Sequence, residues 1–140
     1  MSGAKVFFDT NILLYLLSSD QAKIERVEAR IADARAAASA VISVQVLNEF
    51  ANVARRKMRL EWPELHETLS ALRDLFRTQS LTPEVHDLGL AYSQRYQLSI
   101  FDGQILASAK LAGCATVYSE DMQHGQRITD TLVIRNPFVD

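Results

Sequence analysis

The sequence contains few of the residues that cross-link a chain or anchor it in a membrane. Its 140 residues include one cysteine, Cys114, so an internal disulfide and a cysteine-based zinc cage are both excluded. The clean apolar run Ile12–Leu17 is far too short to cross a bilayer. Residues 1–5 show no charged region followed by a signal-type apolar stretch. These absences predict a cytoplasmic protein with no membrane partner.

The sequence also lacks an excess of positive charge. Fifteen Lys and Arg residues face seventeen Asp and Glu residues, which gives a formal net charge of −2 and a pI of about 5.9. This balance argues against a protein that coats nucleic acid with a broad basic surface. Any nucleic-acid binding must therefore be local or helped by metal cations. The length and the 48% hydrophobic content predict one domain over residues 1–140.

Short apolar strands alternate with amphipathic helices along the chain. We expect strands at residues 5–8, 40–43, 115–118 and 131–134. We expect helices at residues 12–17, 21–36, 44–58 and 103–112, with two more that begin at Trp62-Pro63 and Thr82-Pro83. Alternation of this kind predicts an α/β fold, a three-layer α/β/α sandwich around a mainly parallel sheet.

The first strand ends in three polar residues, Asp9-Thr10-Asn11. In α/β proteins, polar residues at the C-terminal tip of a buried strand lie where ligands bind. Asp9 and Asn11 are also good N-cap residues for the helix that follows. Capping and a functional role therefore both remain open for this stretch alone.

Further acids follow the other predicted strands. Glu49 lies on the helix after residues 40–43, Asp102 lies at the start of the helix 103–112, and Asp121 follows the strand 115–118. The C-terminal tips of parallel strands share one edge of the sheet, so these acids can converge with Asp9. Each has a simpler interpretation: Asp102 as an N-cap, Asp121 as a turn cap and Glu49 as a surface residue.

A cluster of acids is costly unless a cation neutralises it, because close carboxylates repel and raise one another's proton affinity. Oxygen ligands without His or Cys favour Mg²⁺ or Mn²⁺ over Zn²⁺. Such ions accept phosphate oxygens and acidify bound water. The chemistry that fits is phosphodiester hydrolysis.

The ordered set of these motifs resembles the PIN-domain ribonucleases, and within them the VapC-type toxins of bacterial toxin–antitoxin pairs. The resemblance covers essentially the whole chain. It rests on Asp9-Thr10-Asn11, on Ser43 followed by Glu49, on residues 101–109 with Asp102, on residues 118–122, and on Asn136-Pro137-Phe138.

The resemblance implies roles for particular residues. The implied catalytic and metal-binding acids are Asp9, Glu49, Asp102 and Asp121, with Asp9 and Asp102 the favoured pair; the implied supporting residues are Thr10, Asn11, Ser43 and Ser119. The implied activity is an Mg²⁺- or Mn²⁺-dependent endoribonuclease that leaves a 3′-hydroxyl and a 5′-phosphate, with transfer RNA among the possible substrates. The implied partners are a second copy of the chain and a small antitoxin whose C-terminal segment lies over the acidic cleft. Glu120 is an extra acid beside Asp121.

Two other features have open interpretations. The basic run Arg55-Arg56-Lys57 can bind RNA phosphates or simply stabilise a helix C-terminus. Trp62 can belong to a dimer or antitoxin surface, or it can pack in the core or in a hydrophobic staple.

Two alternative functions compete with the nuclease. A phosphatase with Asp9 as nucleophile would need a second acid, and Asn11 stands in that place. The other alternative is a catalytically silent PIN-like module that binds metal, RNA or a protein partner.

Overall fold

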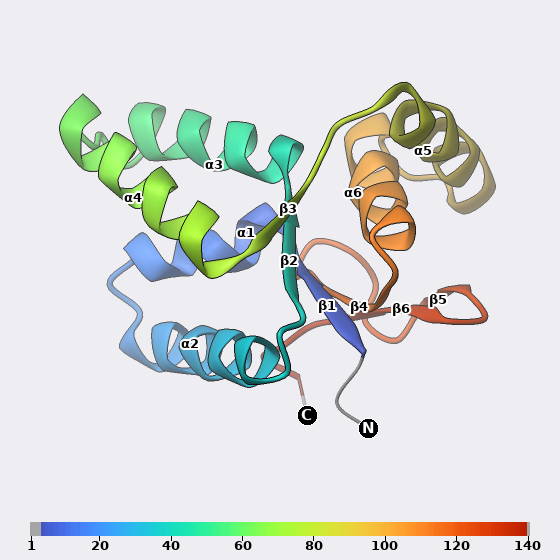
Figure 1. Cartoon of the computed structure of the whole chain (residues 1–140), viewed down its shortest axis with the longest axis horizontal. Helices are drawn as coiled ribbons and strands as arrows, with labels where there is room; N and C mark the ends of the chain where they lie inside the picture. The colour runs from blue at the N-terminus through green and yellow to red at the C-terminus, as the bar shows by residue number, and fades with distance from the viewer. Residues whose placement is uncertain (1–3, 140) are drawn as a thin grey trace.

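The central element is a six-stranded sheet with the strand order β3-β2-β1-β4-β6-β5 (Figure 1). The computed structural model describes residues 4–139. Residues 1–3 and residue 140 lie outside the described part, and so does part of the stretch 1–5 in which we expect no signal peptide. The pairs β3–β2, β2–β1, β1–β4 and β4–β6 are parallel, and β5 pairs with β6 antiparallel. The prediction of a mainly parallel sheet is confirmed.

The strands follow the apolar runs of the sequence, with two additions. Their bounds are β1 Lys5–Phe8, β2 Ala40–Ser43, β3 Arg77–Gln79, β4 Cys114–Tyr118, β5 Arg127–Thr129 and β6 Leu132–Arg135. The predicted strands 115–118 and 131–134 are each displaced by one residue at one or both ends. β3 and β5 were not predicted, because each is a three-residue edge strand with a largely polar sequence.

The helices are α1 Thr10–Leu13, the 3₁₀ helix η1 Leu14–Leu17, α2 Gln21–Ala36, α3 Val44–Arg56, α4 Trp62–Leu75, α5 Pro83–Tyr96 and α6 Ile100–Leu111. Side chains cap several N-termini: Ser43 accepts a hydrogen bond from the Val46 N–H, and Ser99 accepts one from the Asp102 N–H. α6 therefore begins at Ile100, earlier than predicted, and Ser99 rather than Asp102 is its N-cap. α3 ends at Arg56, two residues before the predicted end at Met58.

The helices cover both faces of the sheet. Parallel crossovers are right-handed, so α1–α4, which connect β1 to β2 and β2 to β3, lie on one face. α5 and α6 connect β3 to β4 in the opposite direction and lie on the other face, as Figure 1 shows. The three-layer α/β/α architecture is confirmed.

The order of strands creates a switch point beside β1. The chain leaves β1 to form β2 on one side, and it later returns to form β4 on the other side. Ligand sites of open α/β sheets lie at the carboxyl ends of strands where the order reverses in this way. Asp9 and Ser119 directly follow the two strands at this point.

The core lies on both sides of the central strands. Its side chains are almost fully buried; they include Phe7, Phe8, Ile42, Val117 and Ile134. Apolar runs buried on both faces are typical of parallel strands. Cys114 is also buried, as predicted, and burial raises the pKa of its thiol to about 12. No helix in residues 4–139 is long and apolar enough to cross a membrane.

α5 and α6 approach each other closely at two glycines. A Cβ placed on Gly103 would lie 2.3 Å from the Gly89 carbonyl oxygen and 2.1 Å from the Ser93 Oγ. Only a residue without a side chain fits at this crossing. The close contact fixes the first turn of α6, which carries Asp102.

Candidate active site

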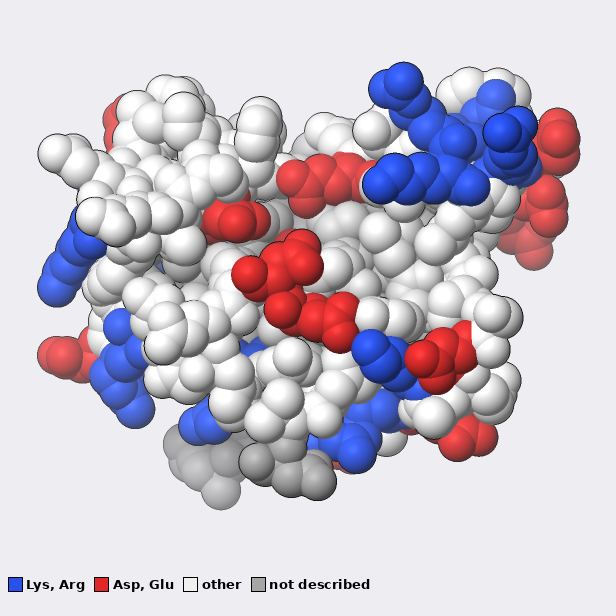
Figure 2. Space-filling view, turned by 180° about the vertical axis from the view of Figure 1, so that it is seen from behind, with Lys and Arg blue, Asp and Glu red and all other residues white. Residues whose placement is uncertain are grey.

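A cavity of about 310 Å³ opens where the predicted acids converge. It is lined by Asp9, Thr10, Asn11, Leu14, Glu49, Asn52, Val53, Asp102 and Asp121. These residues come from the ends of β1 and β4, from α1, and from helices on both faces of the sheet. Figure 2 shows acidic side chains gathered near the centre of one face of the molecule. All four predicted acids therefore lie around one cavity.

Asp9 is the buried anchor of this cavity, with a side chain only 4% exposed. Its Oδ1 accepts a hydrogen bond from the Thr10 N–H at 2.7 Å. Its Oδ2 accepts hydrogen bonds from the Ser119 Oγ at 2.8 Å and the Asn11 Nδ2 at 3.1 Å. Asp9 is also the N-cap of α1. The same Asp9 side chain thus caps α1 and lines the cavity.

Asn11 connects the two strand ends. Its Nδ2 also donates to the Asp121 Oδ2 at 3.1 Å, and its Oδ1 accepts from the Glu120 N–H at 3.0 Å. The amide therefore holds the loop after β4 against the loop after β1. An amide can do this because it offers both donors and an acceptor, which a carboxylate does not.

Glu49 is fixed from two directions. Its Oε1 accepts a hydrogen bond from the Thr10 Oγ1 at 2.7 Å, and its Oε2 accepts one from the Gln45 Nε2 at 3.2 Å. The same Gln45 amide donates to the Phe101 carbonyl at 3.0 Å. Gln45 thereby links α3 to the turn of α6 that carries Asp102, across two layers of the fold.

The cavity raises the pKa of two of its carboxyl groups. Burial, opposed by the Ser119 and Thr10 hydrogen bonds and aided by the charges of Glu49 and Asp102, raises the pKa of Asp9 to about 7. Burial and the nearby charges of Asp121 and Glu49 also raise the pKa of Asp102. The acids are thus close enough to repel one another, and a cation in the cavity would relieve that repulsion.

The sequence pattern of the PIN domain family matches residues 6–127, which is most of the chain and includes every residue lining the cavity. The chain belongs to the PIN domain family. No curated protein matches the sequence.

Solved structures show the same fold. A DNA-bound VapBC complex from Salmonella typhimurium has a TM-score of 0.71 at 15% identity, over 96% of this chain and 98% of that one. A toxin–antitoxin complex from Klebsiella pneumoniae has a TM-score of 0.69 at 23% identity, again over 96% and 98%. VapC20 of Mycobacterium tuberculosis, described as a toxin that cleaves the sarcin-ricin loop, has a TM-score of 0.65 at 17% identity, over 84% and 90%. Identities this low establish a shared fold.

The donor set of this PIN domain suits a hydrated hard cation. Its acidic oxygens and the absence of His and Cys from the cavity lining match Mg²⁺ or Mn²⁺. Within residues 4–139, no three His, Cys, Asp or Glu side chains are grouped closely enough to hold a metal ion together. Mg²⁺ usually binds through one or two carboxylates and keeps several waters. The cavity therefore fits a hydrated divalent cation that would be held by one or two of these carboxylates.

The supporting residues divide into two groups. Thr10, Asn11 and Ser119 each donate a hydrogen bond to one of the acids. Ser43 does not reach the cavity lining; it is fully buried and caps α3, so it sets the direction of the helix that carries Glu49. Gln45 and Asn52 belong to the site but were not predicted. They lie two and nine residues after Ser43, and nothing in the sequence marks these positions as functional. Their role depends on how α3 is placed against α6.

Glu120 takes a structural role outside the cavity lining. Its Oε2 pairs with the Lys23 Nζ at 3.1 Å, and its Oε1 accepts a hydrogen bond from the Tyr15 hydroxyl at 2.5 Å. The Lys23 ammonium also lies 4.7 Å from the centre of the Phe138 ring. This Lys23 cluster attaches the loop after β4 to η1, α2 and the C-terminal segment.

A larger cavity lies elsewhere on the PIN domain. It measures about 670 Å³ and lies between α3 and α4, with His66, Arg73 and Asp74 among its lining residues. It contains none of the acids that follow the strands. Since ligand sites of such sheets lie at strand ends, the smaller, acidic cavity is the candidate active site.

Proposed function

We propose that this PIN domain is a metal-dependent endoribonuclease that acts in the cytoplasm as the toxin of a toxin–antitoxin pair. One observation carries the proposal: four acids from separate segments line one cavity, and the pKa values of two of them, Asp9 and Asp102, are raised by burial and mutual repulsion. Acids held in this way are typical of sites that bind a divalent cation and act on phosphate esters.

Asp9 and Asp102 are the residues that we expect to hold Mg²⁺ or Mn²⁺ directly. When bound, the ion neutralises the acids, lowers the pKa of a water molecule and stabilises charge on phosphate oxygens. Asp9 is held in place for this role by Ser119, Asn11 and the Thr10 N–H. Because its hydrogen bonds all come from rigid neighbours, its carboxylate is preorganised.

The carboxylates of the other two acids, Glu49 and Asp121, differ in how firmly hydrogen bonds hold them. Both oxygens of Glu49 accept hydrogen bonds, from Thr10 and Gln45, so Glu49 contributes a fixed negative charge. Asp121 is exposed and accepts its hydrogen bond from Asn11 on Oδ2. Asp121 is therefore the acid that we expect to accept a proton from the attacking water.

The proposed partners are RNA, a small antitoxin and a second copy of the chain. Support for the antitoxin comes from the similar fold of proteins solved as toxin–antitoxin complexes in Klebsiella pneumoniae and Salmonella typhimurium. The dimer and the preference for transfer RNA rest on the family resemblance.

A catalytically silent module is the second candidate, because no group of three acids in residues 4–139 is assembled around one metal position. A phosphatase has less support. Asn11, which would replace its second acid, makes hydrogen bonds to Asp9, Asp121 and the Glu120 backbone.

The test is cleavage of total transfer RNA and total ribosomal RNA by the purified chain with Mg²⁺, Mn²⁺ or EDTA. The controls are Asp9→Asn and Asp130→Asn; Asp130 is an exposed acid in the turn between β5 and β6. We expect the wild type and D130N to cut RNA with metal only, and D9N to lose at least 100-fold in rate. Products should carry a 5′-phosphate.

Two results would favour other functions. Cleavage by D9N at the wild-type rate would show that the activity comes from another site or a contaminant. Metal binding without cleavage of either RNA pool would favour the silent module.

A further inference from the structure

A second pocket lies beside the acidic cavity, between the C-terminal half of α3 and the start of α4. It measures about 430 Å³ and is lined by Ala51, Asn52, Arg55, Arg56, Trp62 and Leu65. Its lining combines an aromatic ring, two guanidinium groups and an amide. We call it the Trp62 pocket.

Trp62 is 56% exposed, which excludes the core position considered from the sequence. Its indole is nevertheless held in place. The Arg55 guanidinium lies 4.4 Å from the ring centre, and the Arg55 Nη1 donates a hydrogen bond to the Leu60 carbonyl at 2.6 Å. The exposed ring thus offers an aromatic surface, backed by Arg55, on which a planar ligand can stack.

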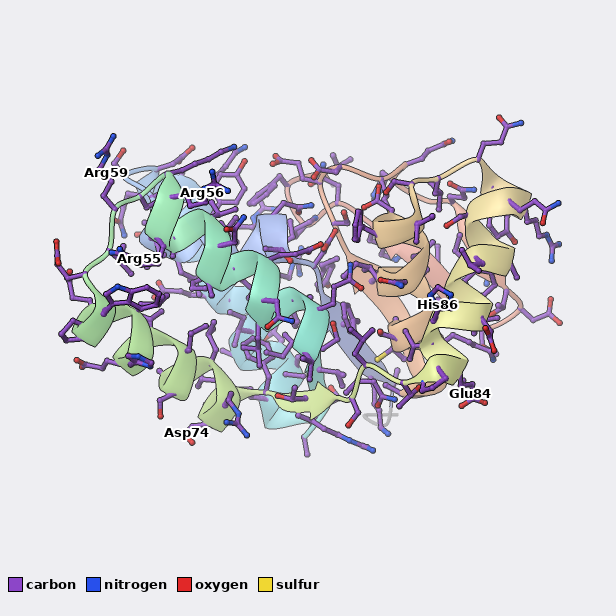
Figure 3. All side chains as sticks on the ribbon, turned by 90° about the horizontal axis from the view of Figure 1, so that it is seen from above. Arg55, Arg56, Arg59, Asp74, Glu84 and His86 are labelled. Carbon is purple, nitrogen blue, oxygen red and sulfur yellow. The ribbon has the colours of Figure 1, made fainter. Side chains whose placement is uncertain are left out.

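The surroundings of the pocket are positively charged. Arg56, Lys57 and Arg59 are all exposed next to Arg55 in the sequence. Figure 3 shows Arg55, Arg56 and Arg59 together at the end of α3, and Figure 2 shows basic side chains gathered over this corner. The nearby acids Glu61 and Glu64 face backbone N–H groups in the capping box of α4, and the four cations outnumber them. An anionic ligand is therefore favoured here over a cationic one.

The Trp62 pocket adjoins the acidic cavity. Asn52 lines both. Glu49, Asn52 and Arg56 follow the i, i+3, i+7 spacing and so lie on one face of α3. That face runs from the acids to the basic end over about 10 Å. A ligand that carries an aromatic group about this far from a phosphate can reach both pockets.

We propose that the Trp62 pocket binds a nucleobase of the RNA substrate, a short distance along the strand from the phosphate in the acidic cavity. The base stacks on Trp62, and Arg56 and Lys57 face the adjoining phosphates. The inference rests on the proposed ribonuclease function and adds a subsite to it. Stacking of bases on aromatic rings tolerates different sequences, so this subsite contributes affinity more than sequence selectivity.

The chain offers a direct readout, because Trp62 is its single tryptophan. Single-stranded octamers of A, C, G or U, each with a fluorescent end label, are titrated in EDTA and in Ca²⁺. Label anisotropy reports binding, and tryptophan emission reports stacking at Trp62. We expect quenching that follows the binding curve for at least one octamer.

Variants distinguish the contribution of base stacking to RNA binding from the contribution of positive charge. Trp62→Ala should weaken binding roughly 10-fold, and Trp62→Phe should restore most of the loss. Arg56→Ala should reduce the slope of log K against log salt by about one. Leu90→Ala, an exposed apolar residue of α5 on the opposite face of the sheet, should bind as the wild type does.

The same variants are also tested for cleavage of an RNA that the wild type cuts. The KM of this reaction distinguishes failure of the subsite from failure of the ribonuclease function. Binding without quenching, together with an unchanged KM for W62A, would overturn the subsite and leave the ribonuclease intact. Neither cleavage of any RNA pool nor binding of any octamer would overturn the proposed function and the subsite with it.

Discussion

The Asp9 side chain is ionisable and almost completely buried, two properties that normally conflict. Its three hydrogen-bond donors stabilise the charged form, yet burial together with the charges of Glu49 and Asp102 outweighs them. The pKa of Asp9 therefore rises from 3.8 to about 7. Without a cation, ionised Asp9 destabilises the folded chain.

The first prediction concerns the dependence of stability on pH in EDTA. Between pH 4 and pH 7 the folded chain keeps a proton on Asp9 that the unfolded chain has lost, so the free energy of unfolding falls as pH rises. The fall is at most about 4 kcal/mol, the equivalent of roughly three pKa units. Urea denaturation at several pH values measures it.

Asp9→Asn is the matched comparison. It should remove most of this slope while losing some stability at pH 5, because the asparagine NH2 group would face a hydrogen-bond donor where an Asp9 oxygen now accepts. Equal slopes for the wild type and D9N would show that Asp9 ionises normally. Added Mn²⁺ should reverse the slope of the wild type, since metal binding requires the deprotonated carboxylate.

At the scale of elements, the site depends on how α5 and α6 cross and how the loop after β4 is attached. Gly103 sits against the Gly89 carbonyl, next to Asp102 in the first turn of α6. Glu120 is bound to Lys23 and Tyr15, next to Ser119 and Asp121. Each contact places an acid without touching the cavity itself.

The second prediction tests the helix crossing. Gly103→Ala puts a methyl group within 2.3 Å of a backbone oxygen, which a side-chain rotation cannot relieve. We expect a loss of about 1–3 kcal/mol in the free energy of unfolding, typical of overpacking, and a lower cleavage rate as Asp102 shifts. Lys110→Ala, at an exposed position of the same helix, should change stability by less than about 0.5 kcal/mol. Equal stability of G103A and K110A would contradict the close crossing.

The third prediction tests the Lys23 cluster. Lys23→Met removes the cation from Glu120; since both side chains are about a third exposed and screened by solvent, the stability cost should be small. Hydrogen exchange at the Glu120 N–H, which donates to Asn11, should nevertheless become faster. Glu120→Gln should add little in the K23M background, because the two changes break one contact. Unchanged exchange in K23M would show that Asn11 alone holds the loop.

The elements were predictable to different degrees for physical reasons. β1 and β2 are apolar runs with clear polar ends, and their bounds agree with the prediction. β3 and β5 have no such pattern, since a short edge strand is defined by its neighbour rather than by its own side chains. The convergence of Asp9, Glu49, Asp102 and Asp121 followed from parallel topology. The contact of Gln45 with the Phe101 carbonyl could not be predicted, because it joins helices from opposite layers.

At the scale of the whole molecule, charge is separated along α3 although the net charge is only −2. The acidic cavity borders the middle of this helix, at Glu49, Asn52 and Val53, and the basic residues lie at its end. The sheet supplies the acids at its switch point, and α3 links them to the Trp62 pocket. A polyanion can therefore bind at the basic end while its phosphate reaches the acids only with a cation present.

The most direct test of this account is the single-turnover rate of RNA cleavage by Asp102→Asn, compared with Asp130→Asn, in saturating Mn²⁺ at pH 8. Both changes remove one carboxylate charge, but only Asp102 lines the cavity. Circular dichroism and thermal unfolding check that both variants are folded. The account predicts that D130N cuts at the wild-type rate and that D102N is slower by at least 100-fold. Equal rates for the two folded variants would contradict it.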